Sequence, residues 1–313
     1  MFKEKLAVVI PTKDRPKELN RLFESICKQE VLPNQTIVID GGKADSDNIL
    51  KKFSHLNIDY AKINIASLTT QRNLGITFLK PDISLVCFFD DDITLEKNSL
   101  SNMLKFWENA TEDVAGATFN NMNHAFRNPT FFERVFLVKA GKPGGVLRSG
   151  FQGLPCSLKE TTQVDWLIGC SMVFRRKIFD EFKFDEWFDG YAHCEDVDFC
   201  YRVGKKYKLY AVADAKIYHF NTLEKIENSF ALGRMQIVNR VYFVKKNSGL
   251  SVLFCYWACL GIFLNNIVRS LLDYDKRHYL RAKGNLAGFF DVFRNKTPQA
   301  PNVESTFYKR LYG

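Results

Sequence analysis

The residues best suited to chemistry are three consecutive aspartates, Asp90, Asp91 and Asp92. They directly follow an apolar run, residues 85–89, that has the composition of a buried strand. Adjacent like charges repel and raise one another's pKa values, so the cluster calls for a nearby cation. Mg²⁺ and Mn²⁺ take oxygen ligands and bridge carboxylates to phosphates. We therefore expect a divalent-metal site at this strand end, with a solvated, Asp-rich helix cap as the alternative.

A second carboxylate cluster, Glu195, Asp196 and Asp198, stands where the pattern predicts the first turn of a helix. The helix dipole favours anions there, so capping is one interpretation and acid–base chemistry the other. Asp198 and Arg202 have the spacing of an intrahelical ion pair, and we interpret these two as structural.

The elements that must position these residues alternate along the chain. Strands are expected at residues 6–10, 36–39, 58–63 and 85–89, and a helix at 69–79. Pro16 fits an early position of another helix, with Asp14 as its expected N-cap. This alternation predicts an α/β fold with a mainly parallel, Rossmann-like sheet and flanking helices.

The pattern loosens after residue 120. The glycine-rich stretch 140–153 is expected to be a mobile loop, which either closes over a substrate or connects elements. Residues 166–176 form a strand-like run that ends in two arginines, and His219 follows a further short strand.

Composition is that of a globular protein, with 313 residues of which 46% are hydrophobic. Eight cysteines show no paired metal-ligand spacing and are typical of core residues in a reducing compartment. The N-terminal residues lead into a strand without the apolar stretch of a signal peptide, which predicts a cytoplasmic protein.

The net charge of +9 is concentrated at one end, because residues 240–313 hold 12 Lys and Arg against 4 Asp and Glu. The same region contains residues 252–264, apolar or Gly throughout, a run shorter than the ~20 residues of a spanning helix. An interfacial helix on an anionic membrane surface and a buried C-terminal helix both fit. The basic residues form no dense run or nucleic-acid motif, so no nucleic-acid partner is predicted.

Five short motifs occur in order along the chain: Ile10-Pro11-Thr12, Ile39-Asp40-Gly41-Gly42, Gln71-Arg72-Asn73-Leu74-Gly75, Phe89-Asp90-Asp91-Asp92 and Glu195-Asp196. Together they resemble an inverting family 2 glycosyltransferase of the GT-A fold, of the bacterial polysaccharide-biosynthesis type, over roughly residues 6–245. The resemblance implies a catalytic domain at 1–245, followed by a basic, apolar helical region at 246–313.

A nucleotide-sugar donor, linked to UDP, dTDP or GDP, is implied at the strand ends. The residues implied in donor binding are Pro11, Thr12, Arg15, Asp40, Gly41, Arg72, Asp90 and Asp91. Gly41 replaces an Asp that is usual in the family, which leaves the base undetermined. Arg72 would supply positive charge for the pyrophosphate or for the fold around it, and a helix-surface ion pair is the alternative.

The resemblance also implies the metal ligands. Asp90 and Asp92 match the family's Asp-x-Asp element, in which the second Asp contacts Mn²⁺ or Mg²⁺ and the first lies near the ribose and the metal. His219 falls where several members have a third metal-contacting residue, with a core or surface histidine as the alternative.

The family's Glu-Asp motif implies Asp196 as the base that deprotonates the acceptor hydroxyl, with Glu195 orienting acceptor or water. Trp166, Gly169 and Trp187 are expected to shape the acceptor pocket. The acceptor itself is expected to be a glycan or a lipid-linked sugar of surface polysaccharide biosynthesis.

Two other functions stay open. A nucleotidyltransferase that makes a nucleotide-sugar would use the same fold, although no Gly-rich phosphate loop follows the first strand. A non-catalytic nucleotide-sugar binder is the second, although it gives no reason for two electrostatically costly carboxylate clusters.

Overall fold

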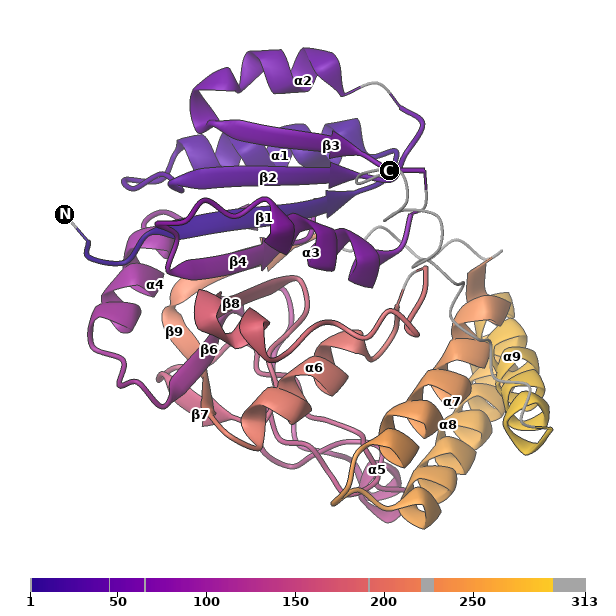
Figure 1. Ribbon diagram of the computed structural model, residues 1–313. Coiled ribbons are helices and arrows are strands. Elements are labelled where there is room, and N and C mark those ends of the chain that lie inside the picture. The colour runs from indigo at the N-terminus through magenta and orange to yellow at the C-terminus, as the bar shows by residue number, and fades with distance from the viewer. Residues whose placement is uncertain (1, 45, 65, 191, 221–227, 295–313) are drawn as a thin grey trace.

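The computed structural model describes residues 2–44, 46–64, 66–190, 192–220 and 228–294 (Figure 1). Nine strands in this part of the chain form one sheet in the order β3-β2-β1-β4-β8-β6-β9-β5, with β7 also paired to β9. The strands are β1 (Leu6–Thr12), β2 (Gln35–Asp40), β3 (Ile58–Lys62), β4 (Leu85–Phe89), β5 (Ile93–Leu95), β6 (Val114–Asn121), β7 (Thr162–Val164), β8 (Ser171–Arg175) and β9 (Lys208–His219). Strands β1–β4, β6 and β9 run one way and β5, β7 and β8 the other, which confirms the mainly parallel α/β sheet.

Helices cover both faces of the sheet. They are α1 (Pro16–Cys27), α2 (Asp47–Lys52), α3 (Leu68–Thr77), α4 (Ser99–Glu108), α5 (Phe131–Val135), α6 (Glu195–Gly204), α7 (Ser229–Lys246), α8 (Val252–Leu272) and α9 (Lys276–Phe293), with short 3-10 turns at Ser54–Leu56 and Arg176–Asp180. The apolar side chains of α1 and α4 pack on one face of the sheet, and those of α3, α6 and α7 on the other.

The parallel pairing aligns the carboxyl ends of the central strands. Thr12, the last residue of β1, lies opposite Asp40, the last residue of β2. Gln71 of α3 fastens these ends together, because its side-chain amide donates to the carbonyls of Thr12 (3.0 Å) and Ile39 (2.7 Å). The loop after β4, which carries the three aspartates, therefore opens onto the same edge.

Two sequence-based expectations about local structure are wrong. Asp14 does not cap α1; its carboxylate accepts hydrogen bonds from the backbone amides of Lys43 (2.6 Å) and Ala44 (2.8 Å) instead. The strand-like run from Trp166 forms a strand only from Ser171, because the preceding residues bend along the edge of the site.

The glycine-rich stretch 140–153 is a hydrogen-bonded hairpin that packs on α7. Val146 bridges to Gln152, and the backbone of Gly144 donates to the carbonyl of Gly153. At Gly150, where φ is +82°, an added Cβ would overlap the side chain of Val244 in α7.

Helices α7, α8 and α9 pack together beside α6, and α8 is longer than the sequence suggested (Figure 1). The apolar run covers residues 252–264, but helix α8 continues beyond it to Leu272 and is 21 residues long in total. Asn266 stays inside it by donating to the side-chain oxygen of Asn285 in α9 (2.8 Å), and Asn285 donates to the carbonyl of Gly233 in α7 (2.7 Å). By length and composition α8 could cross a membrane, and only 28% of its most apolar window is buried.

Candidate active site

The donor-side residues at the ends of β1 and β2 are buried and interlocked. Asp40 accepts hydrogen bonds from the backbone amide of Gly42 (2.7 Å), from Ser46 (3.2 Å) and from Tyr60 (2.9 Å). Gly41 donates its backbone N–H to the carbonyl of Thr12, and a Cβ at Gly41 would overlap Ala66. The Asp40 carboxylate therefore shapes this wall of the site through hydrogen bonds made inside the protein.

Asp91, the middle aspartate, is held against the end of β1. It accepts hydrogen bonds from the hydroxyl of Thr12 (2.7 Å) and from Arg15 (3.0 Å). Burial raises the pKa of Asp91 to about 6, although both of these hydrogen bonds oppose the shift. The same guanidinium nitrogen of Arg15 contacts Asp92 at 3.0 Å, so Arg15 joins two of the three aspartates.

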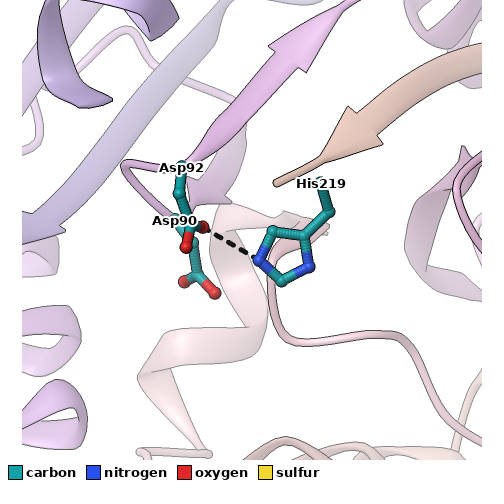
Figure 2. Close-up of side chains that lie close together, drawn as sticks. All are labelled: Asp90, Asp92 and His219. Atoms are coloured by element: carbon teal, nitrogen blue, oxygen red, sulfur yellow. Dashed lines mark hydrogen bonds and ion pairs between the residues drawn. The ribbon is translucent and has the colours of Figure 1, made fainter. Parts of the chain in front are cut away.

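Asp90, Asp92 and His219 come together on one side of this loop (Figure 2). Their candidate ligand atoms all lie within 4.8 Å of one another. Strand pairing brings Asp92 and His219 together. Strand β5 begins just after Asp92 and pairs with β9 so that Ile93 lies opposite His219. The backbone N–H of His219 also donates to the side-chain oxygen of Asn123 (2.6 Å), which fixes the end of β9.

The electrostatics of this trio are those of a cation site. The Nε2 atom of His219 lies 2.9 Å from a carboxylate oxygen of Asp92. Burial alone would lower the pKa of His219, but this hydrogen bond, the contact with Cys170 and the charge of Asp90 raise it to about 11. Burial would conversely raise the pKa of Asp92, but His219 and Arg15 hold it below its usual value. Two carboxylates and an imidazole are a donor set that suits Mn²⁺ and also accommodates Mg²⁺.

Arg72 connects the metal-competent trio to the second carboxylate cluster. Its side chain is fully buried and donates to Asp90 (3.2 Å), to Glu195 (3.0 Å) and to the carbonyl of Gly169 (2.8 Å). Arg72 is therefore part of the structure around the site, and its complete burial excludes the helix-surface ion pair considered above.

Glu195 and Asp196 open α6, as the sequence predicted for a helix start. Asp196 is half-buried; one of its oxygens accepts from the backbone N–H of Gly169 (3.0 Å) and the other from that of Val197 (2.7 Å). Burial, reinforced by the charge of Asp196, raises the pKa of Glu195 to about 8. Burial also raises the pKa of Asp196, against the effect of the Val197 amide and of Arg72.

Gly169 is required beside Asp196 for steric reasons. A Cβ at this position would lie 3.0 Å from the Asp196 carboxylate oxygen and would crowd the hydrogen bond. Its N–H contacts Asp196 while its carbonyl contacts Arg72, so one peptide segment positions both groups.

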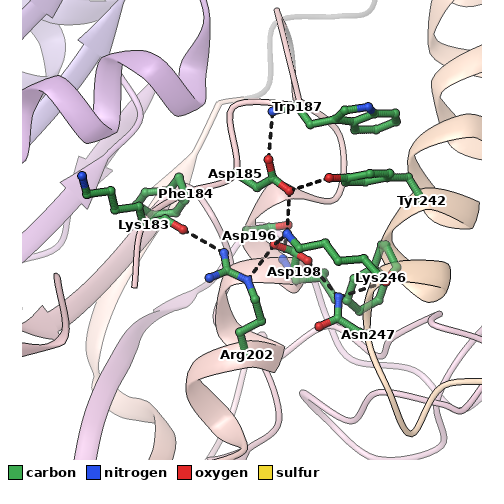
Figure 3. A network of polar contacts seen from close by, with 12 residues as sticks. Lys183, Phe184, Asp185, Trp187, Asp196, Asp198, Arg202, Tyr242, Lys246 and Asn247 are labelled. Atoms are coloured by element: carbon green, nitrogen blue, oxygen red, sulfur yellow. Dashed lines mark hydrogen bonds and ion pairs between the residues drawn. The ribbon is translucent and has the colours of Figure 1, made fainter. Parts of the chain in front are cut away.

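The two tryptophans expected in the acceptor pocket differ in their surroundings. Trp187 is half-buried and stacks on Tyr242 of α7 at 3.6 Å between ring centroids (Figure 3). Trp166 is only 2% exposed, and its ring N–H donates to the carbonyl of Gly153. Its ring therefore has no face open to a sugar, because the hairpin and the core cover it.

The predicted ion pair between Asp198 and Arg202 is confirmed at 3.0 Å (Figure 3). Asp198 also accepts hydrogen bonds from Lys246 (2.9 Å) and Asn247 (2.9 Å) at the end of α7. This network fixes α7 against α6 and is structural.

Sequence reasoning missed Gln71 and Tyr60. Gln71 precedes Arg72 in a motif that was already singled out, so its position was a usable signal. Tyr60 reaches Asp40 only through the pairing of β3 with β2, which no local pattern shows.

Comparison with known proteins finds solved structures with a similar fold. S. aureus TarS residues 1–349 in complex with UDP is similar over 85% of this chain and 72% of its own, with 17% identity and a TM-score of 0.50. The mannosyltransferase PcManGT from Pyrobaculum calidifontis in complex with GDP-Man and Mn²⁺ is similar over 93% and 88%, with 9% identity and a TM-score of 0.59. TarS 1–349 in complex with UDP-GlcNAc is similar over 94% and 92%, with 14% identity and a TM-score of 0.51. No curated protein sequence matches the chain.

The fold is thus that of the GT-A glycosyltransferases. The model of glycosyl transferase family 2 matches residues 7–182, more than half of the chain. The chain belongs to glycosyl transferase family 2, and it is a glycosyltransferase.

Proposed function

We propose that this protein is a metal-dependent, inverting glycosyltransferase that moves a sugar from a nucleotide-sugar to a hydroxyl of a glycan or lipid-linked acceptor. One observation carries the proposal: the buried guanidinium of Arg72 bonds to Asp90 on one side and to Glu195 on the other. A metal-competent trio and a half-buried carboxylate, Asp196, are thereby held at one edge of the sheet. The solved structures with UDP, UDP-GlcNAc and GDP-Man support a nucleotide-sugar as donor.

Each residue has a defined task in this proposal. Asp90, Asp92 and His219 would hold Mn²⁺ or Mg²⁺, which when bound supplies a Lewis acid for the leaving diphosphate. Asp196 accepts the proton of the attacking hydroxyl, as a single displacement with inversion requires one base. The Gly169 amide orients the Asp196 carboxylate, and Glu195 with Arg72 fixes the helix start that carries it.

The donor lies along the ends of β1 and β2. Pro11, Thr12, Asp40 and Gly41 form its wall, and Asp91 braces that wall through Thr12. Arg15 keeps 37% of its side chain exposed, which leaves guanidinium donors free for a diphosphate. Trp187 with Tyr242 offers an aromatic edge to the acceptor.

Release of nucleoside diphosphate from a panel of UDP-, dTDP- and GDP-sugars tests the proposal. We expect slow hydrolysis of one donor with Mn²⁺ or Mg²⁺ and its loss with EDTA. Absence of both binding and release for every donor, also with an acceptor mixture present, would overturn it. Formation of a nucleotide-sugar from a sugar phosphate and a nucleoside triphosphate would instead identify a nucleotidyltransferase.

We also propose that the protein works in surface polysaccharide synthesis in the cytoplasm, attached peripherally to the inner face of the cell membrane. Exposed apolar residues of α8 recur at helical spacing along one side: Leu253, Trp257, Leu260, Val268 and Leu271. Those of α9 do the same: Tyr279, Leu286, Phe290 and Phe293. We call these two stripes the α8–α9 face.

Basic side chains accompany this face. Lys276, Lys283 and Arg294 are exposed along α9, within the region that holds most of the net positive charge. An apolar, aromatic face beside basic residues suits the interface of an anionic leaflet. The low burial of α8 supports this interpretation over that of a buried core helix.

A further inference from the structure

A separate cavity of about 200 Å³ lies behind the start of α6, between the 140–153 hairpin and helices α7 and α8. Its polar lining consists of Gln152, His193, Gln236 and Arg240. Phe151 of the hairpin, Leu154 just after it and Ile262 of α8 supply apolar walls. The volume is below the roughly 300–1,000 Å³ of pockets that enclose whole drug-sized ligands, so it suits one sugar unit or one charged group.

Arg240 at this cavity has a buried charge without a counter-ion among the described residues. It is 3% exposed, and its Nη1 atom donates to the carbonyl of Gly150 (2.5 Å) and to the side chain of Gln152 (2.9 Å). Both acceptors are neutral, and the buried Nε has no hydrogen-bond partner in the described structure. The ring of Phe151 faces the guanidinium at 4.5 Å, which compensates the buried charge less than a counter-ion does, so an anion in the cavity would stabilise it.

The other polar groups can recognise such an anion. The ring of His193 has no hydrogen-bond partner within the described part of the chain, and burial together with the charge of Arg240 lowers its pKa to about 3. His193 is therefore a neutral imidazole that can donate one hydrogen bond. Gln152 and Gln236 add amide groups suited to hydroxyls or to an oxyanion.

The cavity is close to the proposed base. His193 stands three residues before Asp196, and the charge of Arg240 acts on the pKa of Asp196. Asn239, which precedes Arg240 on α7, donates to the backbone carbonyl of His193 (2.9 Å) and so ties α7 to the loop that leads into α6.

We propose that this cavity is an acceptor subsite that binds an oxyanion, a carboxylate or a sugar-borne phosphate, through Arg240, His193 and Gln236. The assignment deepens the proposed function and rests on it, since an acceptor has meaning only for a transferase. It defines the acceptor as an anionic glycan or a sugar phosphate rather than a neutral saccharide.

Binding of small probes without donor or metal tests the subsite directly. The probes are glucuronic acid for a carboxylate, glucose 1-phosphate for a sugar-borne phosphate, inorganic phosphate for the free ion and methyl glucoside as the neutral sugar. The readout is the imidazole NMR signal of His193, one of five histidines in the chain, which separates this cavity from the donor site. We expect glucuronic acid or glucose 1-phosphate to shift that signal and to bind at least about 10-fold more tightly than methyl glucoside.

Two variants and one control sharpen the result. Arg240→Met removes the charge at similar length, and Leu154→Trp fills the cavity while leaving Arg240 in place. Each should weaken binding of the anionic probe at least about 10-fold, whereas Leu154→Ala should not. In transfer assays the first two variants should raise the acceptor KM by a similar factor.

Several outcomes would overturn the subsite. These are equal binding of neutral and anionic sugars, no binding of any probe to the wild-type protein, or full binding by Leu154→Trp. Inorganic phosphate that binds as tightly as glucose 1-phosphate would show an adventitious ion only. If the wild-type protein binds the anionic probes but hydrolyses no donor, the proposed function is refuted and the anion site remains supported.

Discussion

Arg72 is the buried cation that two carboxylates share, so its removal should destabilise both of them. Arg72→Met leaves the buried Glu195 and the partly buried Asp90 without their common partner. Breaking a buried ion pair from one side costs about 3–5 kcal/mol, and we expect a loss of that order in the free energy of unfolding. Denaturant titration measures it.

A double-mutant cycle provides the control for Arg72. Arg72→Met combined with Glu195→Gln removes the stranded charge, so the double variant should be more stable than the sum of the single changes predicts. Strict additivity of the two changes would show that the contact between Arg72 and Glu195 contributes nothing to stability.

Asp196 is the residue on which the proposed chemistry depends. Asp196→Asn keeps the size of the side chain and removes the base, so kcat should fall by about 10²–10⁴-fold with the donor Kd unchanged. Asp189→Asn is the matched control, because Asp189 is exposed and, among the described residues, its side chain hydrogen-bonds only to the neighbouring Gly190 amide. Full activity of a folded Asp196→Asn variant would remove the assignment.

The pH dependence of kcat follows from the raised pKa of Asp196. Its carboxylate must be ionised to act as base, so the rate should fall on the acid side, with a midpoint above the ordinary Asp value of about 3.9. Burial raises the pKa of Glu195 to about 8, so over this acid limb Glu195 is protonated and carries no charge. Glu195→Gln replaces one neutral group by another of similar size, so the acid limb of the kcat profile, measured at saturating metal and substrates, should stay in place in this variant. A clear shift of the limb would show that Glu195 is ionised beside Asp196.

At the residue scale, sequence patterns anticipated the site wherever its residues lie at strand or helix ends. The apolar run of β4 stops where the aspartates begin, so the loop with Asp90 and Asp92 could be predicted. The acidic first turn likewise indicated the start of α6. Patterns could not show that Trp166 is covered by a distant hairpin or that Arg240 has no counter-ion within the part of the chain that the structure describes. Both facts depend on packing between segments far apart in the chain.

At the element scale, α7 and α9 cross closely enough to require glycine. An added Cβ at Gly233 would overlap the backbone carbonyl of Arg281, and one at Gly284 would overlap the backbone of Phe230. Gly233→Ala should therefore push the helices apart and destabilise the protein by about 1–3 kcal/mol. Thermal unfolding measures the loss. Gly141→Ala is the control, because nothing lies within 4 Å of its added Cβ.

Element boundaries were predicted best where local pattern and tertiary pairing agree. The expected strand at 85–89 is β4, and the helix expected at 69–79 is α3 at Leu68–Thr77. Asp14 was misassigned because its real partners, the amides of Lys43 and Ala44, come from another loop. The length of α8 was underestimated because Asn266 finds its partner only on α9.

At the scale of the whole molecule, the α8–α9 face decides whether the enzyme works at a membrane. The face lies on helices that pack through α7 onto α6, so a membrane that contacts it would lie on the side of the molecule near the acceptor subsite (Figure 1). The most exposed apolar side chains of α8 are Leu253 (74%) and Leu271 (68%) of this face and Leu272 (72%), which adjoins Leu271. Full burial of one such side chain stabilises by about 1.5–3 kcal/mol, so three of them should dominate the attachment.

We therefore expect the triple change of Leu253, Leu271 and Leu272 to Gln to weaken binding to vesicles that contain anionic lipid by at least about 10-fold. Gln has a helix propensity similar to that of Leu. The matched control changes Leu32 and Phe78, which are exposed outside this region, to Gln. Vesicle co-sedimentation measures the loss. High salt should also weaken vesicle binding by the wild-type protein, because basic residues accompany the face. Unchanged vesicle binding by the triple variant would refute attachment through this face. If the triple variant loses self-association in sedimentation but keeps its vesicle binding, the α8–α9 face is instead an interface with a second copy of the chain.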